Sequence, residues 1–149
     1  MARIAVQTQD FDLTHEISIL RGDRLDIGAI VTFIGTVRDV GGTLKTMTLE
    51  HYPGMTEKEL TRIAKEAEVR WPLAGCTIIH RYGELNPGDN IVLVITASAH
   101  RHAAFEAAEY LMDFLKSKAP FWKKEDTGGL TKWVDAKESD HDALERWKK

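Results

Sequence analysis

Several strand-like segments of this chain are joined by short turns, and this spacing restricts the fold to a few possibilities. The clearest turn, residues 86–89, reads Asn-Pro-Gly-Asp, and Pro and Gly suit its two central positions. A second short connection runs through Gly128-Gly129. Short turns favour antiparallel pairing, because a parallel crossover needs a dozen or more residues. We therefore expect an α+β fold built on an antiparallel sheet, not a doubly wound one.

β-branched and apolar runs predict the strands. The segment at residues 29–37 reads as a buried strand, and the continuously apolar 91–95 as a central one. The segment 44–52 alternates, with Met47 and Leu49 on its buried side. The remaining strands are expected at residues 3–6, 76–82, 121–125 and 130–134, the last two forming a hairpin.

Helical spacing of apolar residues predicts the helices. A short helix is expected at 13–20. A longer one begins with a capping-box pattern at Thr56 and Glu59 and stops at Pro72. A third helix is expected over 102–118. Its apolar stripe comprises Phe105, Ala108, Met112 and Leu115. The polar segment 137–149 is expected to be helical and to become ordered against a partner.

Composition narrows the class of protein. The 149 residues favour a single domain spanning 1–149. A net charge of -3 argues against a general nucleic-acid binder. No apolar run approaches the roughly 18 residues that a membrane helix needs, and the N-terminus lacks the apolar stretch of a secretory signal. By default we expect a cytoplasmic protein.

The common reactive motifs are absent from the sequence. The one cysteine, Cys76, excludes an internal disulfide framework and lies in an apolar strand, which favours a buried small hydrophobe over a nucleophile. Neither His-x-x-x-His nor Cys-x-x-Cys spacing occurs, so we expect no metal site. The sequence also contains no Gly-rich phosphate loop and no serine nucleophile elbow. The histidines His51 and His80 lie on predicted strands with no assigned role.

The most unusual segment is the lysine-rich stretch 116–125. It holds four of the 20 Lys and Arg residues in an acidic chain. Lys116 ends a predicted helix, and Lys123 follows Pro120 at the start of a strand, so both can face one pocket. Clustered cations lower one another's pKa, and a partly neutral lysine can act as a base. Lysines at a helix C-terminus are usually solvated, however, and from spacing alone that interpretation is favoured.

Two further groups could bind an anion. His100 and Arg101 lie where a buried strand meets a helix, and helix N-termini present free N–H groups to anions. From position alone, a role as a polar entry to the helix is equally favoured. Arg38 ends a strand beside the glycine-containing loop 39–43, a plausible ligand clamp, although such a residue is more often an exposed edge side chain. The sequence therefore predicts an anion pocket lined by Arg38, His100, Arg101, Lys116 and Lys123. Spacing alone does not name its substrate.

Matching stretches give the chain a specific resemblance. It resembles the large, catalytic subunit of molybdopterin synthase over nearly its whole length. The stretches that carry the resemblance are residues 31–38, 49–55, 79–85, 87–89, 98–101, 116–124 and 133–136. Each is weak alone, but their order and spacing together are specific.

The resemblance implies a sulfurtransferase of molybdenum cofactor biosynthesis. Sulfur would come from the C-terminal Gly-Gly thiocarboxylate of a small ubiquitin-like subunit and pass to cyclic pyranopterin monophosphate, forming the dithiolene of molybdopterin. It implies no cofactor. It also implies an α/β hammerhead fold with a small β subdomain, and a homodimer carrying one small subunit at each end. This chain ends in Trp147-Lys148-Lys149, so it is not the carrier.

The resemblance also implies roles for individual residues. Lys116 and Lys123 match the active-site lysines, Lys116 being the nearer to the thiocarboxylate. Arg38, His100 and Arg101 match residues that bind the substrate. Thr36, Val37, Lys124 and Glu125 adjoin the matched positions and are expected to line the site. In a dimer these residues need not all come from one chain.

Two other functions remain compatible with the same residues. The chain could be a non-catalytic module that binds a pterin or nucleotide phosphate, although replaced lysines would be expected there and both are present. It could also be a scaffold whose basic corner docks an acidic partner, with salt-sensitive binding and no turnover.

Overall fold

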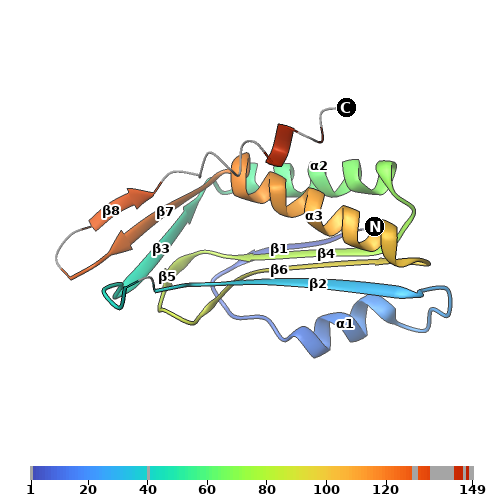
Figure 1. Cartoon of the computed structure of the whole chain (residues 1–149), viewed down its shortest axis with the longest axis horizontal. Helices are drawn as coiled ribbons and strands as arrows, with labels where there is room; N and C mark the ends of the chain where they lie inside the picture. The colour runs from blue at the N-terminus through green and yellow to red at the C-terminus, as the bar shows by residue number, and fades with distance from the viewer. Residues whose placement is uncertain (1, 40, 129–130, 135–142, 146, 148–149) are drawn as a thin grey trace.

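The computed structural model describes residues 2–39, 41–128, 131–134, 143–145 and 147 of the chain. Two sheets and three helices account for the regular structure in this part of the chain (Figure 1). In chain order the elements are β1 (Arg3–Gln7), α1 (Leu13–Arg21), β2 (Ala29–Thr36), β3 (Thr46–His51), α2 (Met55–Arg70), β4 (Leu73–Arg81), β5 (Gly83–Leu85), β6 (Asn90–Ser98), α3 (Arg101–Ser117), β7 (Phe121–Asp126) and β8 (Thr131–Val134).

The first sheet has the strand order β1-β4-β6-β2. The β4–β6 and β2–β6 pairs are antiparallel, and β6 is central, as predicted from its apolar run. The prediction of an antiparallel sheet is wrong for β1, which runs parallel to β4. The chain forms α1, β2, β3 and α2 between these two strands, which is ample for a parallel crossover. The fold is therefore α+β with a mixed first sheet.

Helices cover both faces of this sheet (Figure 1). Successive strand side chains point to opposite faces, so neighbouring residues of β4 enter different cores. Ile78 packs among residues of α2 and α3, whereas Ile79 packs against α1. Both side chains are fully buried, and each contributes about 1.5–3 kcal/mol to folding.

The second sheet, of order β5-β3-β7-β8, is antiparallel and projects from one end of the first (Figure 1). Met47 and Leu49 of β3 are buried, which confirms the alternation predicted for that strand. They form a small core with Val37 and Leu85. Sequence patterns missed β5, which is only three residues long.

Three details of the predicted elements are wrong. Helix α2 begins at Met55, with Gly54 as its N-cap, so the expected Thr56–Glu59 capping box does not form. The Gly54 N–H instead donates to Glu57, at 3.2 Å. Thr56 is fully buried and bonds back to the Tyr52 carbonyl, at 2.8 Å. A fully buried hydroxyl that already has a backbone partner cannot cap the helix.

The other two errors concern side chains that face outward. Phe105 was expected on the buried stripe of α3 but is 59% exposed, because Ala104, Ala107 and Leu111 form the face that packs on the sheet. Strand β2 was expected to be buried, but it is an edge strand, and Phe33 and Ile34 are each 38% exposed. Phe105 and Phe33 lie on the same side of the molecule, where both line a hollow between α3 and β2.

The predicted tail helix, residues 137–149, lies mostly outside the described residues. Residues 143–145 form one helical turn, and Trp147 docks between α2 and α3. The Trp147 indole N–H donates to Asp113, at 2.5 Å, and Arg70 donates to the Trp147 carbonyl, at 2.8 Å. The ring meets Trp71 and Tyr110 edge-on. This aromatic anchor holds the end of the described chain to the helical layer.

Candidate functional site

Helix α3 carries two of the predicted groups at its opposite ends. His100 is the N-cap and Arg101 the first residue, whereas Lys116 lies in the last turn. Seventeen residues at 1.5 Å per residue give a helix roughly 25 Å long. One chain therefore does not bring His100 and Arg101 next to Lys116, and the five-residue pocket predicted from the sequence does not form within it.

Thr36, Val37 and Arg38 lie at the Lys116 end of the fold. Strand β2 runs antiparallel to β6, so Ala29 pairs with Ser98 and Thr36 with Asn90. Helix α3 returns along the sheet from the Ser98 end towards the Asn90 end. Val37 is buried, and two backbone hydrogen bonds hold it in place. Its N–H donates to the Asp89 carbonyl, at 2.9 Å, and its carbonyl accepts from the Gly88 N–H. Thr36 and Arg38 are exposed.

The two neighbouring lysines of β7 point to opposite faces. Lys123 pairs with Leu49 of β3, and Lys124 pairs with Thr48. Paired residues of antiparallel strands share a face, so Lys123 lies on the side of the small core and Lys124 on the reverse side. Glu125, which pairs with Met47, shares the face of Lys123. Lys123 and Glu125 are both half-buried.

Phe121 connects Lys123 with Lys116. It lies two residues before Lys123 on the same face of β7, and its ring stacks on His80 of β4 at 3.7 Å with an interplanar angle of 18°. The positive charge of Lys116 acts on the same His80 imidazole. We name this region the lysine corner, comprising Lys116, Phe121 and Lys123 with His80 beneath them.

His80 is held uncharged in the lysine corner. It is 7% exposed, and its Nδ1 lies 2.8 Å from the Arg81 carbonyl. Burial is the main cause that lowers its pKa, from 6.5 to about 4, with further lowering by Lys116 and His51 against the opposing effect of the Arg81 carbonyl. Sequence reasoning assigned His80 no role. Its burial could have been predicted, because it follows Cys76 and Ile78 at the spacing of one strand face.

Cys76 has the expected character of a buried small hydrophobe. It is 4% exposed, and burial raises the pKa of its thiol to about 12. A thiol of this kind is not ionised near neutral pH and is a poor nucleophile.

The N-terminal end of α3 is exposed and cationic. His100 has an extended backbone and makes no side-chain cap hydrogen bond, and the first turn contains no acidic residue. The strand below is firmly fixed, since Ser98 donates to the Pro72 carbonyl at 2.8 Å. His100 and Arg101 are both exposed. This end therefore presents the Arg101 charge and the backbone N–H groups of the first turn to solvent.

An apolar hollow of about 350 Å³ lies midway along α3, between that helix and β2. We name its lining the α3–β2 patch, comprising Val31, Thr32, Phe33, Phe105, Ala108, Glu109 and Met112. Glu109 is the central residue of the helix, so the patch lies equally far from Arg101 and from Lys116.

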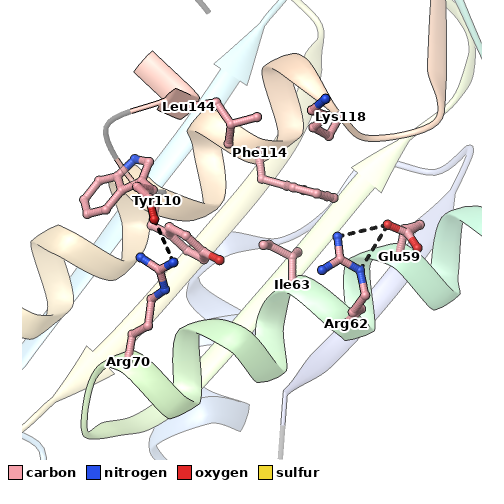
Figure 2. A pocket seen from close by; sticks show the side chains of 9 residues that line it. Glu59, Arg62, Ile63, Arg70, Tyr110, Phe114, Lys118 and Leu144 are labelled. Carbon is pink, nitrogen blue, oxygen red and sulfur yellow. Dashed lines mark hydrogen bonds and ion pairs between the residues drawn. The ribbon is translucent and has the colours of Figure 1, made fainter. Parts of the chain in front are cut away.

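A second hollow, of about 370 Å³, lies between α2 and α3 and is lined in part by Leu144 and Trp147 (Figure 2). Arg62 pairs with Glu59 along one of its walls, and Lys118 borders it. It contains neither Lys116 nor Lys123, and we assign it no part in the site.

No helix in the described ranges is long and apolar enough to cross a membrane. Within the same ranges, no three His, Cys, Asp or Glu side chains gather as they would around a metal ion.

Comparison with known proteins identifies the family. The family model of the MoaE protein matches residues 6–118. The molybdopterin synthase catalytic subunit of Mesorhizobium japonicum is 58% identical over 147 residues, which cover 97% of this chain and 92% of that protein. The solved molybdopterin biosynthesis MoaE protein of Burkholderia ambifaria superposes with a TM-score of 0.86 at 52% identity, covering 99% of this chain and 98% of that one. The chain belongs to the MoaE family of molybdopterin synthase catalytic subunits, enzymes of molybdenum cofactor biosynthesis.

A more distant structure shares the fold. A chain of the complex of subunits 1 and 2 of molybdopterin-converting factor from Helicobacter pylori superposes with a TM-score of 0.73 at 19% identity, covering 91% of this chain and 90% of that one.

Proposed function

We propose that this subunit transfers sulfur from the C-terminal thiocarboxylate of a small ubiquitin-like carrier to cyclic pyranopterin monophosphate, forming the dithiolene of molybdopterin. The observation that carries the proposal is the lysine corner, where Lys116 and Lys123 flank one buried aromatic contact. The buried thiol of Cys76 cannot serve as a sulfur donor at the surface, so the sulfur must come from another molecule.

In this proposal the two lysines have different tasks. Lys116, on the exposed last turn of α3, assists proton transfer at the pterin side chain as the thiocarboxylate arrives. Lys123, half-buried on β7, holds the negative charge of the substrate. Arg38, which closely follows β2, binds the phosphate group of the substrate, beside Thr36 and Val37. Glu125 lines the pocket on the face of Lys123. Lys124 points to the reverse face of β7 and has the weakest structural support among the proposed binding residues.

His100 and Arg101 are proposed to complete the site of a second copy of the chain. The α3–β2 patch is apolar, lies at the midpoint of α3, and borders the open edge of β2. If the two-fold axis passes through that patch perpendicular to α3, it exchanges the two ends of the helix, so that Arg101 of one copy approaches Lys116 of the other. Such a homodimer has two equivalent sites, each built from both copies.

The remaining partners and the domain organisation are proposed as follows. Residues 1–149 form one domain with the α/β hammerhead architecture, in which the second sheet is the small β subdomain. A small subunit binds near each lysine corner and inserts its Gly-Gly tail there, in a cytoplasmic heterotetramer without a resident cofactor. The two-subunit complex solved from Helicobacter pylori supports this assembly by analogy.

A turnover assay tests the proposal. The purified chain is mixed with thiocarboxylated carrier and cyclic pyranopterin monophosphate, and the dithiolene pterin is followed as its fluorescent oxidised derivative. Lys116→Ala is expected to bind the carrier but to lose turnover by about a hundredfold or more, the usual range for removing a proton-transfer group. Lys118→Ala is the matched control, because Lys118 is also exposed near the end of α3 but borders the other hollow.

The outcomes separate the competing functions. A folded, carrier-binding wild type that makes no product would contradict the catalytic proposal and favour a binding module. Weakened carrier binding by Lys116→Ala with unchanged turnover at saturating carrier would favour a scaffold.

A further inference from the structure

Beneath the two lysines lies an aromatic junction, comprising His51, His80, Tyr82 and Phe121. Phe121 begins β7, stacks on His80 of β4, and lies 6.1 Å from the His51 ring of β3. His51 also contacts Tyr82, at 4.4 Å between ring centroids. The junction therefore joins the first sheet to the second at the point where β7 starts.

Both histidines of the junction are held in fixed orientations by hydrogen bonds. His80 donates through Nδ1 to the Arg81 carbonyl, at 2.8 Å, so in the neutral ring Nε2 carries no proton. Thr56 donates its hydroxyl proton to the Tyr52 carbonyl, and His51 Nδ1 therefore donates to the Thr56 oxygen, at 3.0 Å. The Tyr52 N–H donates to the same oxygen, at 3.1 Å. The two imidazole rings near Phe121 are thus anchored to the backbones of β4 and of the turn before α2.

The junction is adjacent to both lysines. Lys123 follows Phe121 by two residues on the same face of β7, so a shift of the Phe121 ring moves the start of the strand that carries Lys123. The positive charge of Lys116 acts on the His80 ring and contributes to the lowering of its pKa. The described groups that face His80 are Lys116 from α3, His51 from β3 and Phe121 from β7. Hence His80 contacts β7, which carries Lys123, and lies within the electrostatic range of Lys116 on α3.

We propose that His80 is a positioning residue for the reaction: its stack on Phe121 fixes the start of β7 against β4, and so sets the separation of Lys123 from Lys116. The inference rests on the proposed function of those lysines. His80 acts through the shape of its ring and its contact with Phe121, and it takes no part in proton transfer.

Substitutions that keep or remove the ring test this. His80→Asn keeps an amide that can donate to the Arg81 carbonyl but loses the stack, and Phe121→Ala loses it from the other side. Each is expected to lower kcat by about tenfold or more, because misplacing a catalytic group by about 1 Å can cost a hundredfold, with KM for the carrier within about threefold of wild type. His80→Phe keeps the stack and is expected to retain most of kcat. The double variant His80→Asn/Phe121→Ala should lose no more than the worse single variant.

The matched control is Tyr110→Ala, which removes aromatic contacts in the anchor around Trp147, away from the lysine corner. It is expected to lower the unfolding temperature and to leave kcat of the folded protein unchanged. His80→Gln and Phe121→Leu serve as milder replacements should His80→Asn or Phe121→Ala fail to fold.

A second measurement does not depend on turnover. In protein labelled with ¹³C-lysine, the Cε resonances of Lys116 and Lys123 are expected to shift in His80→Asn and to stay near their wild-type positions in His80→Phe. Equal kcat in wild type and His80→Asn, or equal losses in His80→Phe and His80→Asn, would overturn the positioning role. Unmoved lysine resonances in His80→Asn would overturn it even if the wild type proved inactive, an outcome that by itself contradicts only the proposed function.

Discussion

The two ends of α3 are built in different ways. At the C-terminal end, Lys116 lies beside a buried imidazole, and three strands converge beneath it. At the N-terminal end, His100 and Arg101 are exposed, and no side chain caps the helix. One end is packed against strands of its own chain, whereas the other presents exposed polar side chains and backbone N–H groups to solvent. The proposed function treats the two ends as halves of one site, which a second copy of the chain would combine.

The largest effect on the proposed two-copy site is expected from blocking the α3–β2 patch. Phe105→Glu places a charge on a side chain that is 59% exposed, so the single chain should still fold. A charge buried in an apolar interface is costly, and we expect the variant to be monomeric by sedimentation at micromolar concentration and to lose turnover by about a hundredfold or more.

The control for this variant is Val69→Glu, at a position that is 86% exposed on α2, outside the patch. It should leave both association and turnover unchanged. A Phe105→Glu dimer with full turnover would show that this patch is not the interface.

Removing the cation from the other half-site should have a smaller effect. Arg101→Ala is expected to lower turnover about tenfold to a hundredfold and to raise KM for the pterin phosphate, because a charge-assisted hydrogen bond to phosphate is lost. Folding and carrier binding should be unaffected, since the side chain is exposed. The kinetic constants of Arg101→Ala at fixed ionic strength are the measurement. The neighbouring His102→Ala, which removes only a surface contact with Glu106, is the control.

The smallest expected effect is a pH dependence of stability from the C-terminal half-site. The pKa of His80 is about 4 in the folded chain, lowered mainly by burial, and near 6.5 in the unfolded chain. Above pH 6.5 both states are neutral. As the pH falls below 6.5, only the unfolded state binds a proton, so stability decreases until about pH 4. The loss should be about 2 kcal/mol between pH 7 and pH 5, and about 3 kcal/mol at most.

Urea unfolding of wild type and His80→Phe at both pH values measures this contribution. The variant lacks the titrating group, so wild type should lose about 2 kcal/mol more than the variant. Equal losses in the two proteins would show that His80 is not buried as described.

Sequence patterns predicted most elements because their side chains obey local rules. The central position of β6 and the alternation of Met47 and Leu49 follow from apolar periodicity alone. The parallel pairing of β1 with β4 could not be predicted, because it joins strands separated by a long stretch of chain. The N-terminus of α2 was misassigned because Thr56, which resembles a cap, is instead a buried partner of the Tyr52 backbone.

Two of the errors bear on the site itself. Phe105 and strand β2 were predicted to be buried, and in one chain Phe105 and Phe33 of that strand are partly exposed on the same apolar patch. Their patterns agree with burial between two copies, which composition and periodicity cannot distinguish from burial within one. The distance between His100 and Arg101 on one side and Lys116 on the other was not predicted either. The sequence interpretation placed all three in one pocket, whereas nearly the full length of α3 separates them.

The measurement that tests the shared site most directly is complementation between two variants of low turnover. Lys116→Ala and Arg101→Ala chains carrying different affinity tags are coexpressed, and the mixed dimer is purified through both tags. One of its two sites then lacks both side chains, while the other combines an intact Lys116 from one chain with an intact Arg101 from its partner. The mixed dimer should therefore recover about half of the wild-type turnover. Turnover no higher than the mean of the two variant homodimers would contradict a site built from both ends of α3.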